Sequence, residues 1–274
     1  MLKQRIITAI ILFVLLMAAL FAAPTMVWQL LVLAIVWQSS VEWARLSHIS
    51  GLPAHAYCVS LTLVMIGVLW LDTSLTNDGQ TYLHLAFYAL AILLWVFVVP
   101  TWLIASWKPK MPLFMGTIGL VLILPTALAM LDLRAYNPWA LLFAMSMVWM
   151  ADTSAYFAGR RFGKTKLAPA ISPGKTWEGV YGALVAVTAY VLVCWAAGLF
   201  SIYQNFFPGM IVAAWWWVGL SVIGDLFESA IKRQAGVKDS GALLPGHGGL
   251  LDRIDALTST LPFAGLALML QRLA

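Results

Sequence analysis

The residues best suited to chemistry lie near the C-terminus, where residues 232–256 read KRQAGVKDSGALLPGHGGLLDRIDA. Four lysines and arginines, one histidine and three aspartates gather here, directly before the last apolar run of the chain. Ionisable groups beside lipid hydrocarbon are costly and usually have a functional role. The PGHGG segment predicts a turn into a helix, on whose first turns Asp252 and Asp255 lie at i and i+3. The helix dipole alone would favour Asp252, but it explains less of Asp255.

A second group of polar residues ends the preceding apolar run, in GDLFESAIKR at residues 224–233. Asp225, Ser229 and Lys232 follow at i, i+4 and i+7, so a helix places them on one face. A long basic side chain can reach the interface from there, but a short aspartate cannot. Carboxylates from two helix ends, Asp225 with Asp252 or Asp255, can converge on Mg²⁺, which completes its shell with substrate phosphates and water.

A third group occupies residues 149–179, WMADTSAYFAGRRFGKTKLAPAISPGKTWEG. Asp152 ends an apolar run and is predicted to face the bundle interior or a wet cavity. The segment after it carries five cations, but GRRFGKT lacks the glycine spacing of a Walker A motif and no strand precedes it. Dense positive charge on flexible backbone suits a polyphosphate, although a solvated loop on the positive side of a membrane is the simpler alternative. Together the three groups predict a metal-assisted phosphate site.

The elements that must position these groups are membrane-spanning helices. The chain has 274 residues, of which 62% are hydrophobic and 10% charged, and its mean hydropathy is +0.91. A spanning helix needs about 20 mostly apolar residues. We therefore expect an all-α polytopic integral membrane protein, a single domain over 1–274 in which helices of 1–140 precede a site-bearing part at 141–274. The expected spans, about nine in number, are roughly 6–23, 26–43, 56–71, 82–105, 113–131, 139–158, 177–200, 209–231 and 250–271.

The distribution of lysine and arginine predicts the orientation of these spans, because cytoplasmic loops hold the excess of both. With a cytoplasmic N-terminus, about fourteen of these residues fall inside and two, Arg134 and Arg272, outside. The active site is then expected at the cytoplasmic face. Arg45, Lys108 and Lys110 are explained by topology and by anionic lipid headgroups. The spans before Asp152 read as almost free of ionisable residues, and His48, His55 and His84 read as interfacial.

The residues from Ser229 to Asp255 (SAIKRQAGVKDSGALLPGHGGLLDRID) resemble throughout the signature of the phosphatidate cytidylyltransferase, or CDP-diacylglycerol synthase, family. DTSAYFAGRRFGK and SPGKTWEG resemble other segments of that family, whereas residues 1–140 resemble it only in being polytopic. The resemblance implies an enzyme that uses Mg²⁺ to convert CTP and phosphatidic acid into CDP-diacylglycerol and pyrophosphate. It also implies a role in phospholipid biosynthesis, and we expect the protein in a bacterial inner membrane.

These considerations lead to hypotheses for individual residues. The expected metal ligands are Asp225, Asp252, Asp255 and Asp152. Side chains expected to contact phosphates of either substrate are Lys232, Lys238, Arg253 and Ser229. The side chains expected to bind CTP are Lys164, Ser172, Lys175 and Thr176. His247 would steady the leaving pyrophosphate or bond a carboxylate, and Glu178 would cap a helix or support the site. The expected partners are CTP, phosphatidic acid and membrane lipids but no nucleic acid, and the oligomeric state, a homodimer included, stays open.

Rival functions make different demands on the sequence. A transporter or channel also needs buried carboxylates, but its polar residues should follow a path near the bilayer midplane, often in two matching halves. The polar residues here gather at one face instead. A CTP-dependent polyprenol kinase, or an enzyme cytidylylating another lipid phosphate, would need the same metal and phosphate groups, and only the full signature favours phosphatidate. A structural scaffold would need no buried aspartates.

Overall fold

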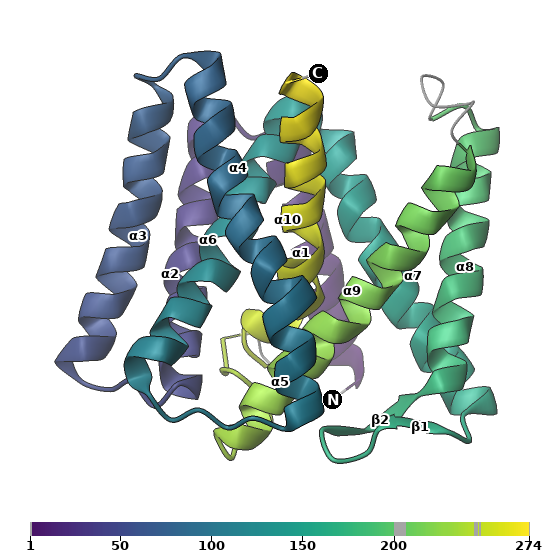
Figure 1. Ribbon diagram of the computed structural model, residues 1–274. Helices are drawn as coiled ribbons and strands as arrows, with labels where there is room; N and C mark the ends of the chain where they lie inside the picture. Colours follow the sequence, from purple (N-terminus) through teal and green to yellow (C-terminus); the bar gives the residue numbers. More distant parts are fainter. Residues whose placement is uncertain (1, 200–206, 244–245, 247, 274) are drawn as a thin grey trace.

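The computed structural model describes residues 2–199, 207–243, 246 and 248–273, and most of them belong to helices (Figure 1). The chain order of the elements is α1 (Leu2–Phe21), α2 (Thr25–Leu46), α3 (Leu52–Asp72), α4 (Asn77–Leu93), the π-helical turn η1 (Leu94–Val98), α5 (Val99–Ala105), α6 (Pro112–Tyr136), α7 (Pro138–Phe162), β1 (Lys166–Ala168), β2 (Ser172–Thr176), α8 (Trp177–Ala196), α9 (Phe207–Gln234) and α10 (Leu251–Leu273).

Eight helices in the described part of the chain are long and apolar enough to cross a membrane. One of them is the continuous helix Asn77–Ala105, in which the wide turn of η1 precedes Pro100. Such π-helical turns and prolines are common causes of kinks in helices. A shorter apolar stretch, Thr8–Phe21, belongs to α1. Eight of the nine expected spans fall on these eight helices, and the other, 6–23, falls on the shorter apolar stretch of α1. The fold is therefore the expected all-α polytopic one, and the protein is an integral membrane protein.

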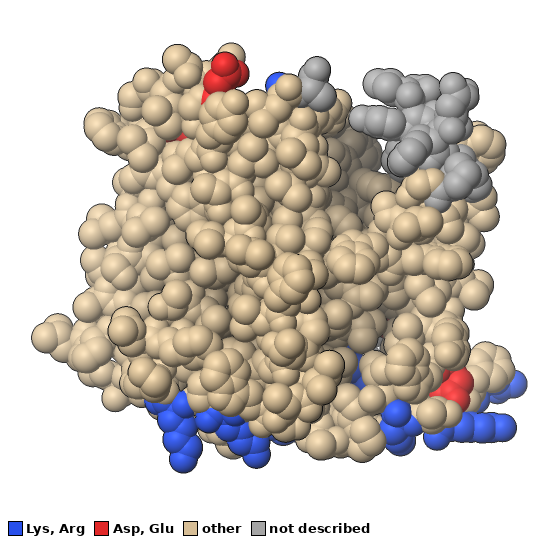
Figure 2. All heavy atoms as spheres, viewed as in Figure 1, with Lys and Arg blue, Asp and Glu red and all other residues tan. Residues whose placement is uncertain are grey.

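The two ends of the bundle differ in charge. The N- and C-termini lie at opposite ends of the molecule (Figure 1), and in the view of Figure 2 lysines and arginines gather at the lower end, where the N-terminus and the β-hairpin lie. We call this surface the basic end. We propose that it faces the cytoplasm, because positive loops are retained there. Cysteine-accessibility labelling should then place residues 72–81 and 158–176 on opposite sides of the membrane. Labelling of both from one side would contradict this orientation.

The segment expected to be a flexible loop forms an antiparallel β-hairpin instead. Lys166 pairs with Thr176 and Ala168 with Ser172. Strand β2 runs directly into α8, and the start of the hairpin is fastened to the same helix because Glu178 accepts hydrogen bonds from the backbone N–H of Thr165 at 3.1 and 3.2 Å. Glu178 therefore holds the hairpin to the start of α8.

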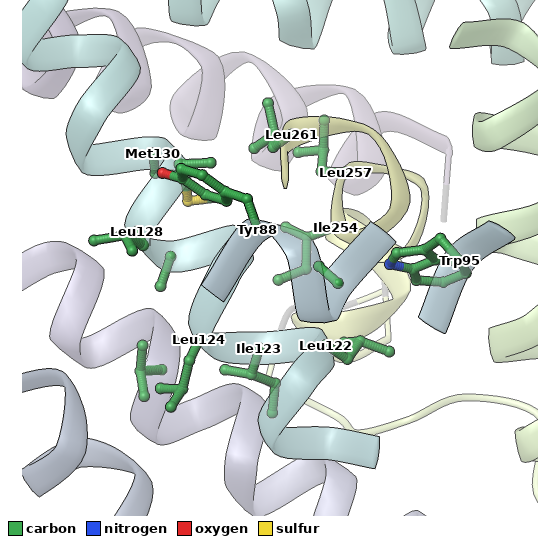
Figure 3. Packing of buried hydrophobic residues seen from close by; sticks show 14 of the residues in the cluster. Tyr88, Trp95, Leu122, Ile123, Leu124, Leu128, Met130, Ile254, Leu257 and Leu261 are labelled. Atoms are coloured by element: carbon green, nitrogen blue, oxygen red, sulfur yellow. The ribbon is translucent and has the colours of Figure 1, made fainter. Parts of the chain in front are cut away.

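The core that positions the site is built around α6 and α10, the most buried of the spans (Figure 3). Phe227 of α9 is fully buried and packs edge-on against Trp95 and Trp102, with ring centroids 5.7 and 5.3 Å apart. Edge-to-face aromatic pairs add to the stabilisation that burial provides. Because Phe227 fixes the rotation of α9 about its axis, it also fixes the directions of Asp225 and Glu228.

Helices α9 and α10 approach closely at Gly224. A Cβ atom at this position would lie 2.5 Å from Ser259 Oγ and 2.9 Å from the carbonyl oxygen of Asp255. Ser259 Oγ also donates a hydrogen bond to the Leu220 carbonyl at 2.8 Å. Glycine is therefore required at 224, and it brings the acidic residues on either side of the contact, Asp225 and Asp255, near each other.

The helices that precede α7 contain more buried ionisable residues than we expect from the sequence. Glu42 and Asp132 are buried, and so is His84, which was expected to be interfacial. His84 Nδ1 lies 2.9 Å from Asp132 Oδ2, and His84 Nε2 lies 3.0 Å from Asp72 Oδ1. Tyr88 donates a hydrogen bond to Asp132 at 2.5 Å. These four side chains join α3, α4 and α6, and pairing of this kind offsets the cost of burying charge.

Replacing His84 should therefore destabilise the fold. His84→Leu leaves Asp132 and Asp72 without the group between them, and removal of one partner of a buried ion pair typically costs about 3–5 kcal/mol. Tyr88→Phe removes one hydrogen bond and should cost about 1 kcal/mol. Thermal unfolding in detergent should show a much larger decrease for His84→Leu than for Tyr88→Phe. Equal midpoints for the two variants would show that the cluster contributes little to stability.

Candidate active site

Strand β2 and helix α9 meet at Asp225 of α9. Lys175 of strand β2 forms an ion pair with it, with Nζ and Oδ2 2.7 Å apart. Ser229, one turn further along α9, donates to Asp225 Oδ1 at 3.3 Å. About a third of the Asp225 side chain and a fifth of the Lys175 side chain remain exposed (35% and 22%). A ligand at the basic end can therefore reach this ion pair.

Two more carboxylates lie near Asp225. Asp152 of α7 is exposed and accepts a hydrogen bond from Ser221 Oγ of α9 at 3.4 Å. Asp255 of α10 is partly buried, and its Oδ1 accepts the backbone N–H of Ala256 at 2.8 Å. The charges of Asp152, Asp225 and Asp255 are close enough to interact with one another. We call these three residues the aspartate cluster.

A second network of charges lies one turn further along α9. Lys232 Nζ is 2.7 Å from Glu228 Oε2 on its own helix and 2.6 Å from Asp252 Oδ1 on α10. The other oxygen of Asp252 accepts hydrogen bonds from the backbone N–H groups of Gly249 at 2.8 Å and Ser240 at 2.9 Å. Asp252 thus joins α9, the loop that follows it and the first turn of α10.

Glu42 of α2 holds the same loop from the other side, which the sequence analysis did not anticipate. Its carboxylate accepts hydrogen bonds from the backbone N–H of Leu250 at 2.8 Å and of Leu251 at 2.9 Å. It also accepts one from Ser240 Oγ at 2.7 Å. Gly249 fits because it has no side chain: a Cβ atom there would lie 2.4 Å from Glu42 Oε2. The only feature of the sequence that could have indicated this role is that Glu42 is a single acidic residue in an expected membrane span.

The other candidate residues differ in their surroundings. Thr176 has a structural role, since its Oγ1 caps α8 by accepting the Gly179 N–H at 3.2 Å. Exposed basic residues without an ion pair among the described residues are Lys164, Lys238 and Arg253. Ser172 is partly buried in β2, and His247 lies outside the described residues. The structure therefore brings together Lys175, Asp225, Asp152 and Asp255, and separately Lys232 and Asp252.

The aspartate cluster has the chemistry of a site for a hard divalent cation. In the part of the chain that the structure describes, no group of three acidic, histidine or cysteine side chains is placed so that it could hold a metal ion by itself. Mg²⁺ does not need such a group, because it is usually held by one or two carboxylates and substrate phosphates. Lys175 is ion-paired with only one of the three carboxylates. In addition, Glu228 Oε1 is buried without a hydrogen-bond partner among the described residues. An uncompensated group of carboxylates fits a cation.

Comparison with known proteins gives a consistent result over almost the whole chain. The model of the cytidylyltransferase family matches residues 3–271. A phosphatidate cytidylyltransferase of Haemophilus influenzae is 36% identical, over 96% of this chain and 97% of the relative. One from Pseudomonas aeruginosa is 38% identical over 97% of both chains. A Brucella melitensis protein of the same name is 46% identical over 138 residues, 49% of each chain.

Proposed function

Because the chain belongs to the cytidylyltransferase family, we propose that it is a phosphatidate cytidylyltransferase that makes CDP-diacylglycerol from CTP and phosphatidate. The observation that carries this proposal is the meeting of carboxylates and lysines from α7, β2, α9 and α10 at the basic end of a membrane-spanning bundle. A lipid substrate requires a site near the membrane surface, and a nucleoside triphosphate requires cations that neutralise its phosphates. The chain is a nucleotidyltransferase of phospholipid biosynthesis.

The reaction joins a phosphate oxygen of phosphatidate to the α-phosphorus of CTP. The bond between that phosphorus and the oxygen bridging to the β-phosphorus breaks, and pyrophosphate leaves with the electron pair. A phosphate monoester is already nucleophilic near neutral pH, so the protein needs no strong base. Its tasks are to hold the reactants in line and to neutralise charge. Two anionic substrates must be brought together, and cationic side chains lower the repulsion between them.

The roles of individual residues follow from where the structure places them. Lys175 lies at the aspartate cluster and can transfer its ammonium contact from Asp225 to a phosphate oxygen. Ser229 can donate its hydroxyl in the same way. The exposed Lys238 and Arg253 are available to phosphates that approach from the loop side. Lys164, Ser172, Lys232 and His247 keep their predicted roles toward the substrates. The oligomeric state, a homodimer included, stays open.

We propose that Mg²⁺ is the metal of this site, held by one or two carboxylates of the aspartate cluster (Asp152, Asp225 and Asp255) together with substrate phosphates. When bound, it would supply positive charge to the phosphate oxygens of CTP. The prediction that Asp252 is also a ligand remains, but its contacts favour a role in holding the loop before α10. One of its oxygens forms an ion pair with Lys232, and the other accepts hydrogen bonds from the backbone N–H groups of Ser240 and Gly249. The carboxylates supply the negative charge that attracts the cation. Phe227 packs α9 against Trp102, and Gly224 allows the close contact between α9 and α10.

A direct assay tests this function. Purified protein in detergent is given labelled CTP with Mg²⁺ and, in turn, phosphatidic acid, a polyprenol and a polyprenol phosphate. Label is expected in a CDP-lipid only with phosphatidic acid, and one pyrophosphate should be released for each product. Transfer of the γ-phosphate to polyprenol would identify a kinase instead. Transfer to polyprenol phosphate alone would identify a cytidylyltransferase with a different lipid substrate.

A further inference from the structure

A cavity lies between α2 and α3, outside the aspartate cluster and the Asp252 network. Its volume is about 660 Å³, within the range of about 300–1,000 Å³ that is typical of small-molecule sites. One side of it comes from α2 and the turn after it, where Trp37, Val41, Ala44, Arg45 and His48 follow at helical spacing. The other side comes from the first turns of α3. The apolar side chains that line it are Trp37, Val41, Ala44, Ile49, Ala54 and Cys58.

The cavity combines these apolar walls with positive charge. Arg45, His48 and His55 also line it. None of the lining residues, all of which the structure describes, is acidic, and Arg45 forms no ion pair within the described part of the chain. His55 Nδ1 donates to the Gly51 carbonyl at 2.9 Å, so Nε2 can donate to an anion when the ring is protonated. The site therefore suits an anion that carries an apolar chain.

The position of the cavity in the membrane-spanning bundle favours a lipid as the ligand. α2 ends and α3 begins at the end of the bundle where the N-terminus lies (Figure 1), which is the basic end. Basic pockets between spanning helices on the cytoplasmic side of a membrane are known sites for anionic lipid headgroups. We propose that the cavity binds a phospholipid of the surrounding bilayer through its negatively charged headgroup, with part of an acyl chain between α2 and α3.

This lipid is distinct from the substrate, because the cavity and the polar loop contact different faces of α2. Glu42, which holds the loop at Leu250 and Leu251, is not among the residues that line the cavity. On a helical wheel it lies more than a quarter-turn from Trp37, Val41 and Ala44, which line the cavity, and about 60° from Arg45. A bound lipid would therefore pack against α2 without occupying the place of phosphatidate.

Native mass spectrometry of the purified full chain tests this site. Phosphatidylglycerol and phosphatidylcholine with the same acyl chains are titrated separately, and the apparent Kd is measured for each. Removing the positive charge with Arg45→Gln/His55→Gln should weaken phosphatidylglycerol binding by about five- to tenfold and leave phosphatidylcholine binding unchanged. Ala54→Phe, which fills the cavity and keeps its charge, should weaken the binding of both lipids.

The matched control is Lys108→Gln/Lys110→Gln, two exposed lysines elsewhere that do not line the cavity. It should retain the preference for phosphatidylglycerol. An equal loss in this control would show general attraction to the basic end and would overturn the proposal, as would an absence of preference in the unmodified protein. A raised KM for phosphatidate in Arg45→Gln/His55→Gln would also overturn it, because the cavity would then belong to the substrate.

Discussion

Asp225→Asn is expected to lower kcat by about 100-fold or more, which corresponds to about 2.7 kcal/mol of lost transition-state stabilisation. The substitution keeps the shape of the side chain and removes its charge. Asp225 lies near both other carboxylates of the aspartate cluster and is the one that pairs with Lys175, at 2.7 Å. Its loss should therefore weaken the hold on Mg²⁺ and also release Lys175 from its position.

Steady-state kinetics at several Mg²⁺ concentrations measure both effects. For Asp225→Asn, the Mg²⁺ concentration that gives half-maximal activity should rise, and saturating Mg²⁺ should restore activity only in part. Asp78→Asn, at an exposed aspartate in the first turn of α4, is the control and should behave as the unmodified protein does. A near-normal kcat for Asp225→Asn at saturating Mg²⁺ would remove Asp225 from the site.

Asp252→Asn should be equally inactive but for a different reason. Asp252 bonds Lys232 and the backbone N–H groups of Ser240 and Gly249, so the loop would lose its fastening to α10. We therefore expect a reduced kcat and a lower unfolding midpoint, with the Mg²⁺ requirement unchanged. A raised Mg²⁺ requirement with normal thermal stability would instead support Asp252 as a metal ligand.

Regular helical spacing explains which parts of the site are visible in the sequence. Asp225, Ser229 and Lys232 lie on one face of α9 because the helix repeats every 3.6 residues, and Ser229 does bond Asp225. The expected spans also fall on the observed helices, since length and hydropathy determine them. These features need only local information, so a single sequence is enough to predict them.

Contacts between distant segments could not be predicted in this way. Lys175 and Asp225 are fifty positions apart, and only the hairpin and the packing of α9 bring them together. Glu42 and Asp132 each sit in long apolar runs, where an isolated acidic residue gives no indication of its partner. The partners are Leu250 and Leu251 for Glu42 and His84 for Asp132. Each contact joins residues at least 48 positions apart in the chain.

Glu42→Gln is expected to lower kcat by about 100-fold, although Glu42 lies in the part of the chain to which the sequence assigned no site residue. A carboxylate has two acceptor oxygens, but an amide has one oxygen and a donor NH₂ group. At least one of the present donors, which are Ser240 Oγ and the N–H groups of Leu250 and Leu251, would then meet the NH₂ group and lose its hydrogen bond. The loop and the first turn of α10 would then shift. A displacement of about 1 Å far from the reacting atoms can cost about 100-fold in rate.

Gln38→Ala is the matched control for this prediction. Gln38 Nε2 donates to Glu42 Oε1 at 2.8 Å within α2, so its loss leaves the bonds between Glu42 and the loop intact, and kcat should change by less than about threefold. Because Glu42 acts by positioning, the effect of Glu42→Gln should fall on kcat more than on the KM for CTP, and the Mg²⁺ requirement should stay the same. Glu42→Gln with a normal kcat and a lower unfolding midpoint would show that the clamp between α2 and the loop serves stability alone. A loss as large in Gln38→Ala would place the effect in α2 itself.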